Sequence, residues 1–229
     1  MNLALDKGGI LQGMPSHEIK LLEKKMEEIL ITFEQNDQYR EALQGYNMIE
    51  MKIKHLLDSL SSEDVNSAYG VLAQCHFRQG NMHRSLGQAA EAPRYSEMEA
   101  EAARQSGYAA TIAQSIFSEG VTLISNKHLS KGLSFLEKAK ELFDQGDNYD
   151  CIQGRGWYWI IKADLGNKGI TETTPEEIIE FSNNALEILA PIENWRGISR
   201  AYLARSIAYR SIGEMKLADR DFAKTKEYE

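Results

Sequence analysis

The sequence predicts an all-α protein, a stack of about five antiparallel helical hairpins. Only four of its 229 residues are proline, 42% are hydrophobic and 26% are charged, which suits a helical chain that can bury a core. Amphipathic stretches alternate with short polar turns along the chain. The order aromatic, polar turn, Ala, aromatic occurs at 33–46 and again at 209–222. Such recurrence indicates an internal repeat.

The first hairpin is expected over 16–57. Ser16 is a candidate N-cap for its first helix, and the polar pair at 36–37 can turn the chain before a second helix over 39–57. The second hairpin is expected to open at Ser61, which stands three residues before an acidic residue in capping-box spacing.

Glycine and proline residues predict the turns and helix ends of the second and third hairpins. The second hairpin is expected to turn at Gly80–Asn81, and its second helix to bend at Pro93. The third hairpin is expected over 107–146, with a turn at 125–128 and with Gly146 as a left-handed C-cap.

The last two hairpins carry clearer signals. In the fourth, the second helix is expected to start with Thr174 as N-cap and Pro175 at the first helical position. The fifth is expected over 193–228, with its turn at Gly213–Glu214.

Aligned by their turns, the five copies resemble the tetratricopeptide repeat (TPR) family over residues 16–228. The best matches are "YRSIGEMKLADRDFAKTKEY" and "NNALEILAP". The equivalent positions Ala42, Ser85, Gly132, Ile178 and Ala218 are 43, 47, 46 and 40 residues apart, whereas the usual repeat has about 34. Long repeats of this kind are similar to those of kinesin light chain, SNAP-type adaptors and bacterial peptide-receptor arrays.

The resemblance implies a right-handed α-solenoid that forms a single domain over 16–229, after a flexible N-terminal segment at 1–15. Arg205 stands where the family usually has an apolar residue. We therefore expect it to extend its charge to solvent or to find an acidic partner.

In TPR proteins the first helix of each hairpin lines a concave groove that holds peptides or helices of partner proteins. The resemblance implies such a groove here. Its candidate residues are Phe77, Arg78, Phe117, Val121, Arg155, Tyr158, Lys162, Arg200, Leu203, Ile207 and Arg210.

The last hairpin supports a binding face by geometry alone. At 100° per residue, one arc of about 80° holds Arg196, Arg200, Leu203, Ile207 and Arg210. Guanidinium groups bind carboxylates bidentately and the aliphatic groups can cover their flanks, which favours an acidic, partly apolar peptide. Residues 196–229 have eight Lys or Arg and five Asp or Glu, a net +3 within a total of −8. A solvated helix face, or packing against a further element, is the alternative.

Other functional classes have weaker support. Cys75, His76 and His83 supply at most three metal ligands and are expected to be packing and turn residues, and the aromatic run at 157–159 is expected to be core. No nucleophile with a base, phosphate-binding loop or zincin motif is present, so we expect neither enzyme activity nor a cofactor.

Composition bounds the environment and the partners. The net charge of −8 argues against non-specific nucleic-acid binding. The longest apolar run, 157–161, is too short for a membrane span. The start of the chain lacks the apolar region of a signal peptide, and two cysteines do not make a disulfide framework. We expect a cytoplasmic protein without membrane insertion.

Two functions remain open at this level. The first is a non-enzymatic adaptor or scaffold that docks a peptide or helix of a partner protein in the groove. The alternative is a regulatory sensor array that binds a short peptide or small signal and changes curvature. Homo-oligomerisation through the open ends of the stack would be compatible with either.

Overall fold

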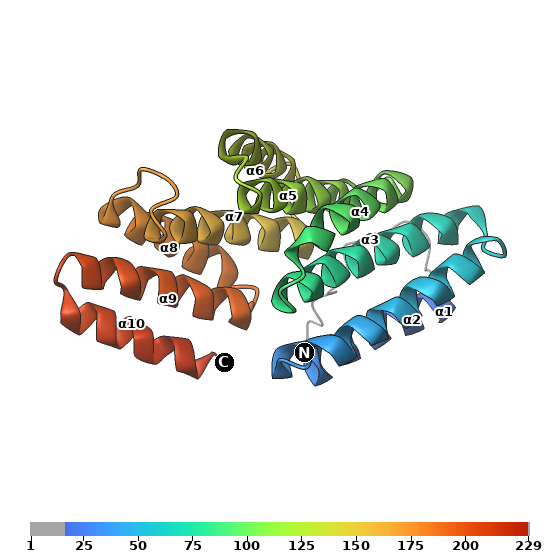
Figure 1. Ribbon diagram of the computed structural model, residues 1–229, viewed down its shortest axis with the longest axis horizontal. Coiled ribbons are helices and arrows are strands. Elements are labelled where there is room, and N and C mark those ends of the chain that lie inside the picture. The colour runs from blue at the N-terminus through green and yellow to red at the C-terminus, as the bar shows by residue number, and fades with distance from the viewer. Residues whose placement is uncertain (1–16, 229) are drawn as a thin grey trace, which may run out of the picture. The chain divides into compact units, whose positions relative to one another are not determined.

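Helices follow one another through residues 17–228, the part of the chain that the computed structural model describes (Figure 1). Within that part there are ten α-helices and no strand, which confirms the predicted all-α class. Their bounds are α1 His17–Thr32, α2 Tyr39–Leu57, α3 Ser62–Ser85, α4 Ala92–Ser106, α5 Ala109–Ser125, α6 Leu129–Phe143, α7 Tyr149–Asn167, α8 Pro175–Leu189, α9 Trp195–Ser211 and α10 Met215–Glu227. The predicted segment 1–15 and the N-cap Ser16 lie outside the described residues.

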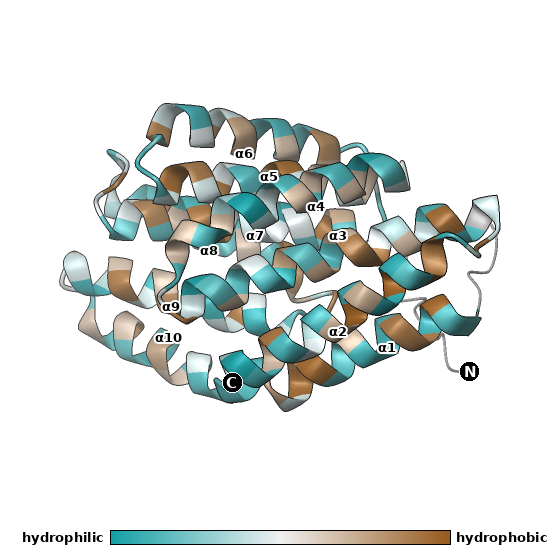
Figure 2. Ribbon diagram, turned by 45° about the vertical axis from the view of Figure 1, so that its right-hand side comes forward, coloured by the Kyte–Doolittle hydropathy of each residue, from teal (hydrophilic) through white to brown (hydrophobic). Residues whose placement is uncertain are grey.

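The helices fall into two compact units, divided between residues 142 and 143. In the first, α1 and α2 pack side by side, as do α3 and α4; in the second, α7 packs on α8 and α9 on α10 (Figure 1). Hydrophobic and polar residues alternate along α1 and α2, as in amphipathic helices (Figure 2). The expectation of one repeat domain over 16–229 stays a prediction.

The second helix of each of the first four hairpins buries one stripe of residues, spaced i, i+4, i+7 and i+11. This spacing keeps one helix face turned to the core. The stripes are Ala42, Tyr46, Ile49 and Ile53 in α2; Ala92, Ser96, Glu99 and Ala103 in α4; Gly132, Leu136, Ala139 and Phe143 in α6; and Ile178, Ser182, Ala185 and Leu189 in α8. We call these residues the buried stripe.

The buried stripe corrects the repeat register. Its first positions, 42, 92, 132 and 178, and the equivalent buried Ala218 of α10 are 50, 40, 46 and 40 residues apart. Ser85 is the exposed last residue of α3 and not the equivalent of Ala42. Ala92 takes that place.

The second hairpin turns later than predicted. Helix α3 continues through Gly80, which is buried and would bring a Cβ atom within 3.3 Å of the Tyr95 Cβ. The turn is made instead by Gly87, whose φ is +74°, a conformation that glycine adopts without strain. Pro93 does not bend a helix but lies in the first turn of α4, where its missing N–H is not needed.

Gly146 is also not the predicted left-handed C-cap, because its φ is not positive. A Cβ atom at this position would lie 2.6 Å from the Cys151 Sγ, so close packing explains this glycine.

Other boundaries agree with the sequence. The Ser61 side chain accepts a hydrogen bond from the Asp64 N–H at 3.3 Å. Thr174 and Glu177 form a complete capping box around Pro175, and Gly213 makes the last turn with φ +81°. Helices α5 and α6 approach closely, since a Cβ atom on Gly132 would lie 2.7 Å from the Gly120 carbonyl oxygen.

A carboxyl group occupies the third position of the stripe in α4. Glu99 is 3% exposed, and burial raises its pKa well above the ordinary value, although Ser118 and Arg84 act in the opposite direction. Arg84 donates to the Asn81 Oδ1 at 2.6 Å and to the Thr122 Oγ1 at 3.3 Å. Its hydrogen bonds therefore do not depend on an ionised Glu99.

Glu99→Gln should raise the free energy of unfolding at pH 7, because it removes a carboxyl group whose charged form is disfavoured by burial. A carboxyl group whose pKa rises on folding keeps its proton better in the folded state, so stability falls as pH rises above the ordinary value of 4.5. Urea unfolding between pH 4.5 and pH 8 measures this, with the exposed Glu97→Gln as control. A clear loss of stability in Glu99→Gln would show instead an ionised pair with Arg84.

Candidate functional site

The predicted groove residues of the first unit are largely committed to the interior. Arg78 donates to the Glu34 Oε1 at 3.1 Å, and the Tyr46 hydroxyl donates to the Glu34 Oε2 at 2.9 Å. Phe77 is half-buried, its ring 5.7 Å from the Arg78 guanidinium. In α5, Phe117 is 7% exposed and Val121 is half-buried. These side chains hold helices together more than they form an open surface.

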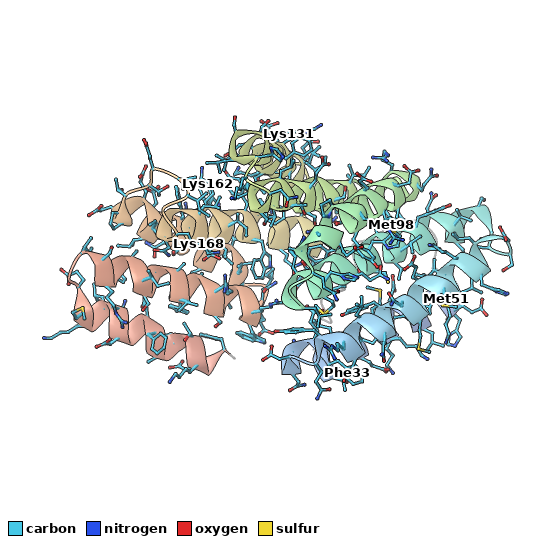
Figure 3. The ribbon with its side chains drawn as sticks, in the orientation of Figure 1. Phe33, Met51, Met98, Lys131, Lys162 and Lys168 are labelled. Atoms are coloured by element: carbon cyan, nitrogen blue, oxygen red, sulfur yellow. The ribbon has the colours of Figure 1, made fainter. Side chains whose placement is uncertain are left out.

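The candidates on α7 are held in the same way. Arg155 donates to the carbonyl oxygens of Phe143 at 2.7 Å and Gly146 at 2.8 Å. It thereby satisfies backbone groups at the C-terminal end of α6. Tyr158 is 3% exposed. Lys162, labelled in Figure 3, lies over the rings of Phe181 at 5.3 Å and Tyr158 at 5.7 Å.

Helix α9 brings three of its four candidates together. A pocket of about 340 Å³ is lined by Leu203, Ser206, Ile207, Arg210, Ser211 and Phe222; we call it the α9–α10 pocket. Ile207 is 46% and Phe222 44% exposed. The fourth candidate, Arg200, instead forms an ion pair of 2.5 Å with Asp164 of α7. The pocket therefore combines apolar walls with the cation of Arg210.

The cations beside the pocket have weak or partial partners. Arg210 lies 3.3 Å from Asp219, and both side chains are exposed, an arrangement that contributes little in water. Lys226 lies 5.5 Å over the Phe222 ring. From Trp195 to Glu227 there are eight Lys or Arg and four Asp or Glu, a net +4. This hairpin attracts negative charge.

A buried ion pair fixes α10 on α9 next to the pocket. Arg205 donates from Nε to the Asp221 Oδ2 at 2.6 Å and from Nη2 to the Oδ1 at 3.2 Å. Asp221 is fully buried. The prediction that Arg205 finds an acidic partner is confirmed, and the pair positions the neighbouring Phe222.

Sequence reasoning missed Phe222 and Asp221 as residues of this region. Phe222 is the second aromatic of the repeated motif, in which Tyr46 is fully buried, so the motif gave no sign of its exposure. Asp221 follows Arg205 by 16 residues across a turn, a separation that only the paired helices bring into contact.

The residues considered for metal binding have other partners. Cys75 donates to the Tyr46 carbonyl oxygen at 3.2 Å, and burial raises the pKa of this thiol to about 12. The His76 Nδ1 lies 2.8 Å from the Gln79 Oε1, while His83 stacks on Tyr95 at 4.8 Å. Within residues 17–228 no group of three or more His, Cys, Asp or Glu could hold a metal ion.

In the described part of the chain, no helix combines the length and the apolar character needed to cross a membrane.

Solved structures with this arrangement of hairpins are TPR-like repeat proteins. Nearly identical TPR-like repeats from Podosopora anserina, assigned to kinesin light chain, match with TM-score 0.51 and 14% identity over 93% of this chain and 97% of that one. BtubC (BKLC) from P. vanneervenii matches with TM-score 0.53 and 11% identity over 92% and 89%. No protein-family model and no curated sequence matches the chain. At these identities the likeness shows the fold, a TPR-like helical repeat.

Asp221→Ala should lower the free energy of unfolding by about 3 kcal/mol, because it leaves the largely buried Arg205 without its carboxylate. The matched control is Asp219→Ala on the same helix, which removes an exposed pair and should change stability by less than about 1 kcal/mol. Chemical denaturation followed by circular dichroism compares the two. Equal effects would mean that the Arg205–Asp221 pair does not stabilise the hairpin.

Proposed function

We propose that this TPR-like repeat protein is a non-enzymatic interaction scaffold, and that its α9–α10 pocket docks an acidic, partly apolar segment of a partner protein. The observation that carries the proposal is the clustering of Leu203, Ile207 and Arg210 around one pocket. The sequence predicts all three residues on the first helix of the last hairpin. The other predicted residues are mostly engaged in internal contacts, which narrows the proposed surface to α9 and α10.

The chemistry of the pocket suits such a segment. Ile207 and Phe222 are each nearly half exposed, and covering apolar surface is worth about 25 cal/mol per Å². Arg210 can exchange its weak pair with Asp219 for a carboxylate of the partner at little cost, because exposed ion pairs contribute only about 0–1 kcal/mol. A guanidinium group also binds a carboxylate through two parallel hydrogen bonds.

The lining of the α9–α10 pocket favours docking of a ligand and not catalysis. Two ion pairs lie within this hairpin, Arg205 with Asp221 and Lys224 with Glu227. The pocket is lined by aliphatic, aromatic and hydroxyl side chains and one guanidinium group. Such a lining binds a ligand and orients it, and it contains no base beside a nucleophile.

Arg210→Glu should reduce capture of a specific partner by about tenfold or more, because it replaces attraction of a carboxylate by repulsion. The control is Lys138→Glu on α6, an exposed side chain whose substitution makes the same change in net charge. Each variant carries a photo-crosslinking residue in place of Ile207 and is used in extract of the source cells, with mass spectrometry of crosslinked proteins. A crosslinked partner that both variants retain equally would contradict the proposal.

A further inference from the structure

Phe222 is the exception to the buried stripe. The second stripe position holds Tyr46, Ser96, Leu136 and Ser182 in the other hairpins, and none of these residues is more than 9% exposed. Phe222 at the same position of α10 is 44% exposed, and Met215 on the same helix is 52% exposed. The stripe of α10 is thus buried at Ala218 and Thr225 but open between them.

Exposed residues of α10 share one side of the helix with Phe222. At 100° per residue, Met215, Asp219, Phe222 and Lys226 fall within an arc of about 60°. Phe222 lines the α9–α10 pocket together with Ile207 and Arg210 of α9. We call these six residues the open face.

The same chain shows twice how such a face is covered. Helix α3 packs on α2, and α9 packs on α8. The residues of α3 in the shared core include Ala68, Val71 and Cys75, at i, i+3 and i+7. Those of α9 include Ala201, Ala204 and Ala208 at the same spacing. All six residues are at most 2% exposed.

This spacing has a physical reason. Small or β-branched residues at i, i+3 and i+7 form a narrow stripe on one side of a helix. This stripe lets the backbone of the helix approach the buried stripe of the neighbouring helix. In both cases the stripe is covered by a helix that presents three such residues.

The charge of the open face restricts its occupant further. The open face has two cations, Arg210 and Lys226, and one carboxylate, Asp219, and the hairpin from Trp195 to Glu227 has a net charge of +4. Two copies of this face placed against each other would bring like charges together. Carboxylates at the edge of the covering helix would instead pair with them.

We propose that the open face receives an α-helix of a partner protein, which packs on α10 as α3 packs on α2 and α9 on α8. The helix carries small or aliphatic residues at i, i+3 and i+7 and carboxylates along its edges. This inference rests on the proposed function, because it specifies the form of the segment that docks.

A defined probe tests the helix directly. It is a labelled peptide with the sequence 195–211, in which Glu replaces Arg196, Arg200, Arg205 and Arg210. The peptide keeps the three alanines that cover α8 and reverses the charge for the open face. Fluorescence anisotropy with the full chain measures its binding, and the comparison peptide has Ala204→Pro, which prevents a continuous helix.

We expect the probe to bind and the proline peptide to bind at least about tenfold more weakly. Phe222→Asp in the protein should weaken probe binding by about tenfold or more, because a charge replaces the apolar centre of the contact. The control variant is Ile170→Asp, at a residue 41% exposed in the connection between α7 and α8. Circular dichroism checks that both variants stay helical.

Three results would overturn the helix proposal: absence of probe binding, equal binding of the proline peptide, or equal binding to Phe222→Asp. None of these results would contradict the proposed docking of an acidic segment in the α9–α10 pocket. A partner that docks as an extended acidic segment would still crosslink at position 207 and would still be lost on Arg210→Glu. Failure of that crosslinking experiment alone would remove the proposed function itself.

Discussion

A hairpin of two amphipathic helices has an apolar stripe that it cannot cover by itself, and the rest of this structure follows from that constraint. In the first four hairpins the second helix places its stripe over twelve residues, and a neighbouring helix or hairpin removes it from water. Burial of this surface is the main favourable term in folding. Polar groups that lie on the same surfaces, such as Glu34 and Asp221, must then find partners within the protein.

Local sequence signals predicted the helices well where side chains act on adjacent backbone. Thr174, Pro175 and Glu177 cap the start of α8 through contacts among adjacent residues. Glycine was less informative because it serves two purposes. Gly87 and Gly213 supply the left-handed backbone of a turn, whereas Gly80 and the other packing glycines admit a neighbouring residue. Whether a glycine makes a turn or allows close packing depends on the helix that packs against it. The sequence around the glycine does not identify that helix.

The candidate site was predicted only in part, because local sequence does not show which helix packs against a given face. Helical periodicity places Leu203, Ile207 and Arg210 on one face, and the structure shows that they line one pocket. Periodicity does not show which neighbour covers a face, so Phe117 and Tyr158 were expected in a groove although they lie in the interior. Phe222 shows the reverse case, since it has the motif position of the buried Tyr46 but is 44% exposed.

The buried stripe explains how the repeats can differ in length and still pack in the same way. The first stripe positions are 50, 40, 46 and 40 residues apart, yet the four residues of each complete stripe keep the same spacing. The residues between successive stripes absorb the variation, and lengthening a flexible loop changes its closure entropy only slowly. A profile of fixed period would therefore lose register within two copies, while a comparison of backbones tolerates the added residues. Divergence of such a chain can erase its sequence signature long before it changes the packing of its helices.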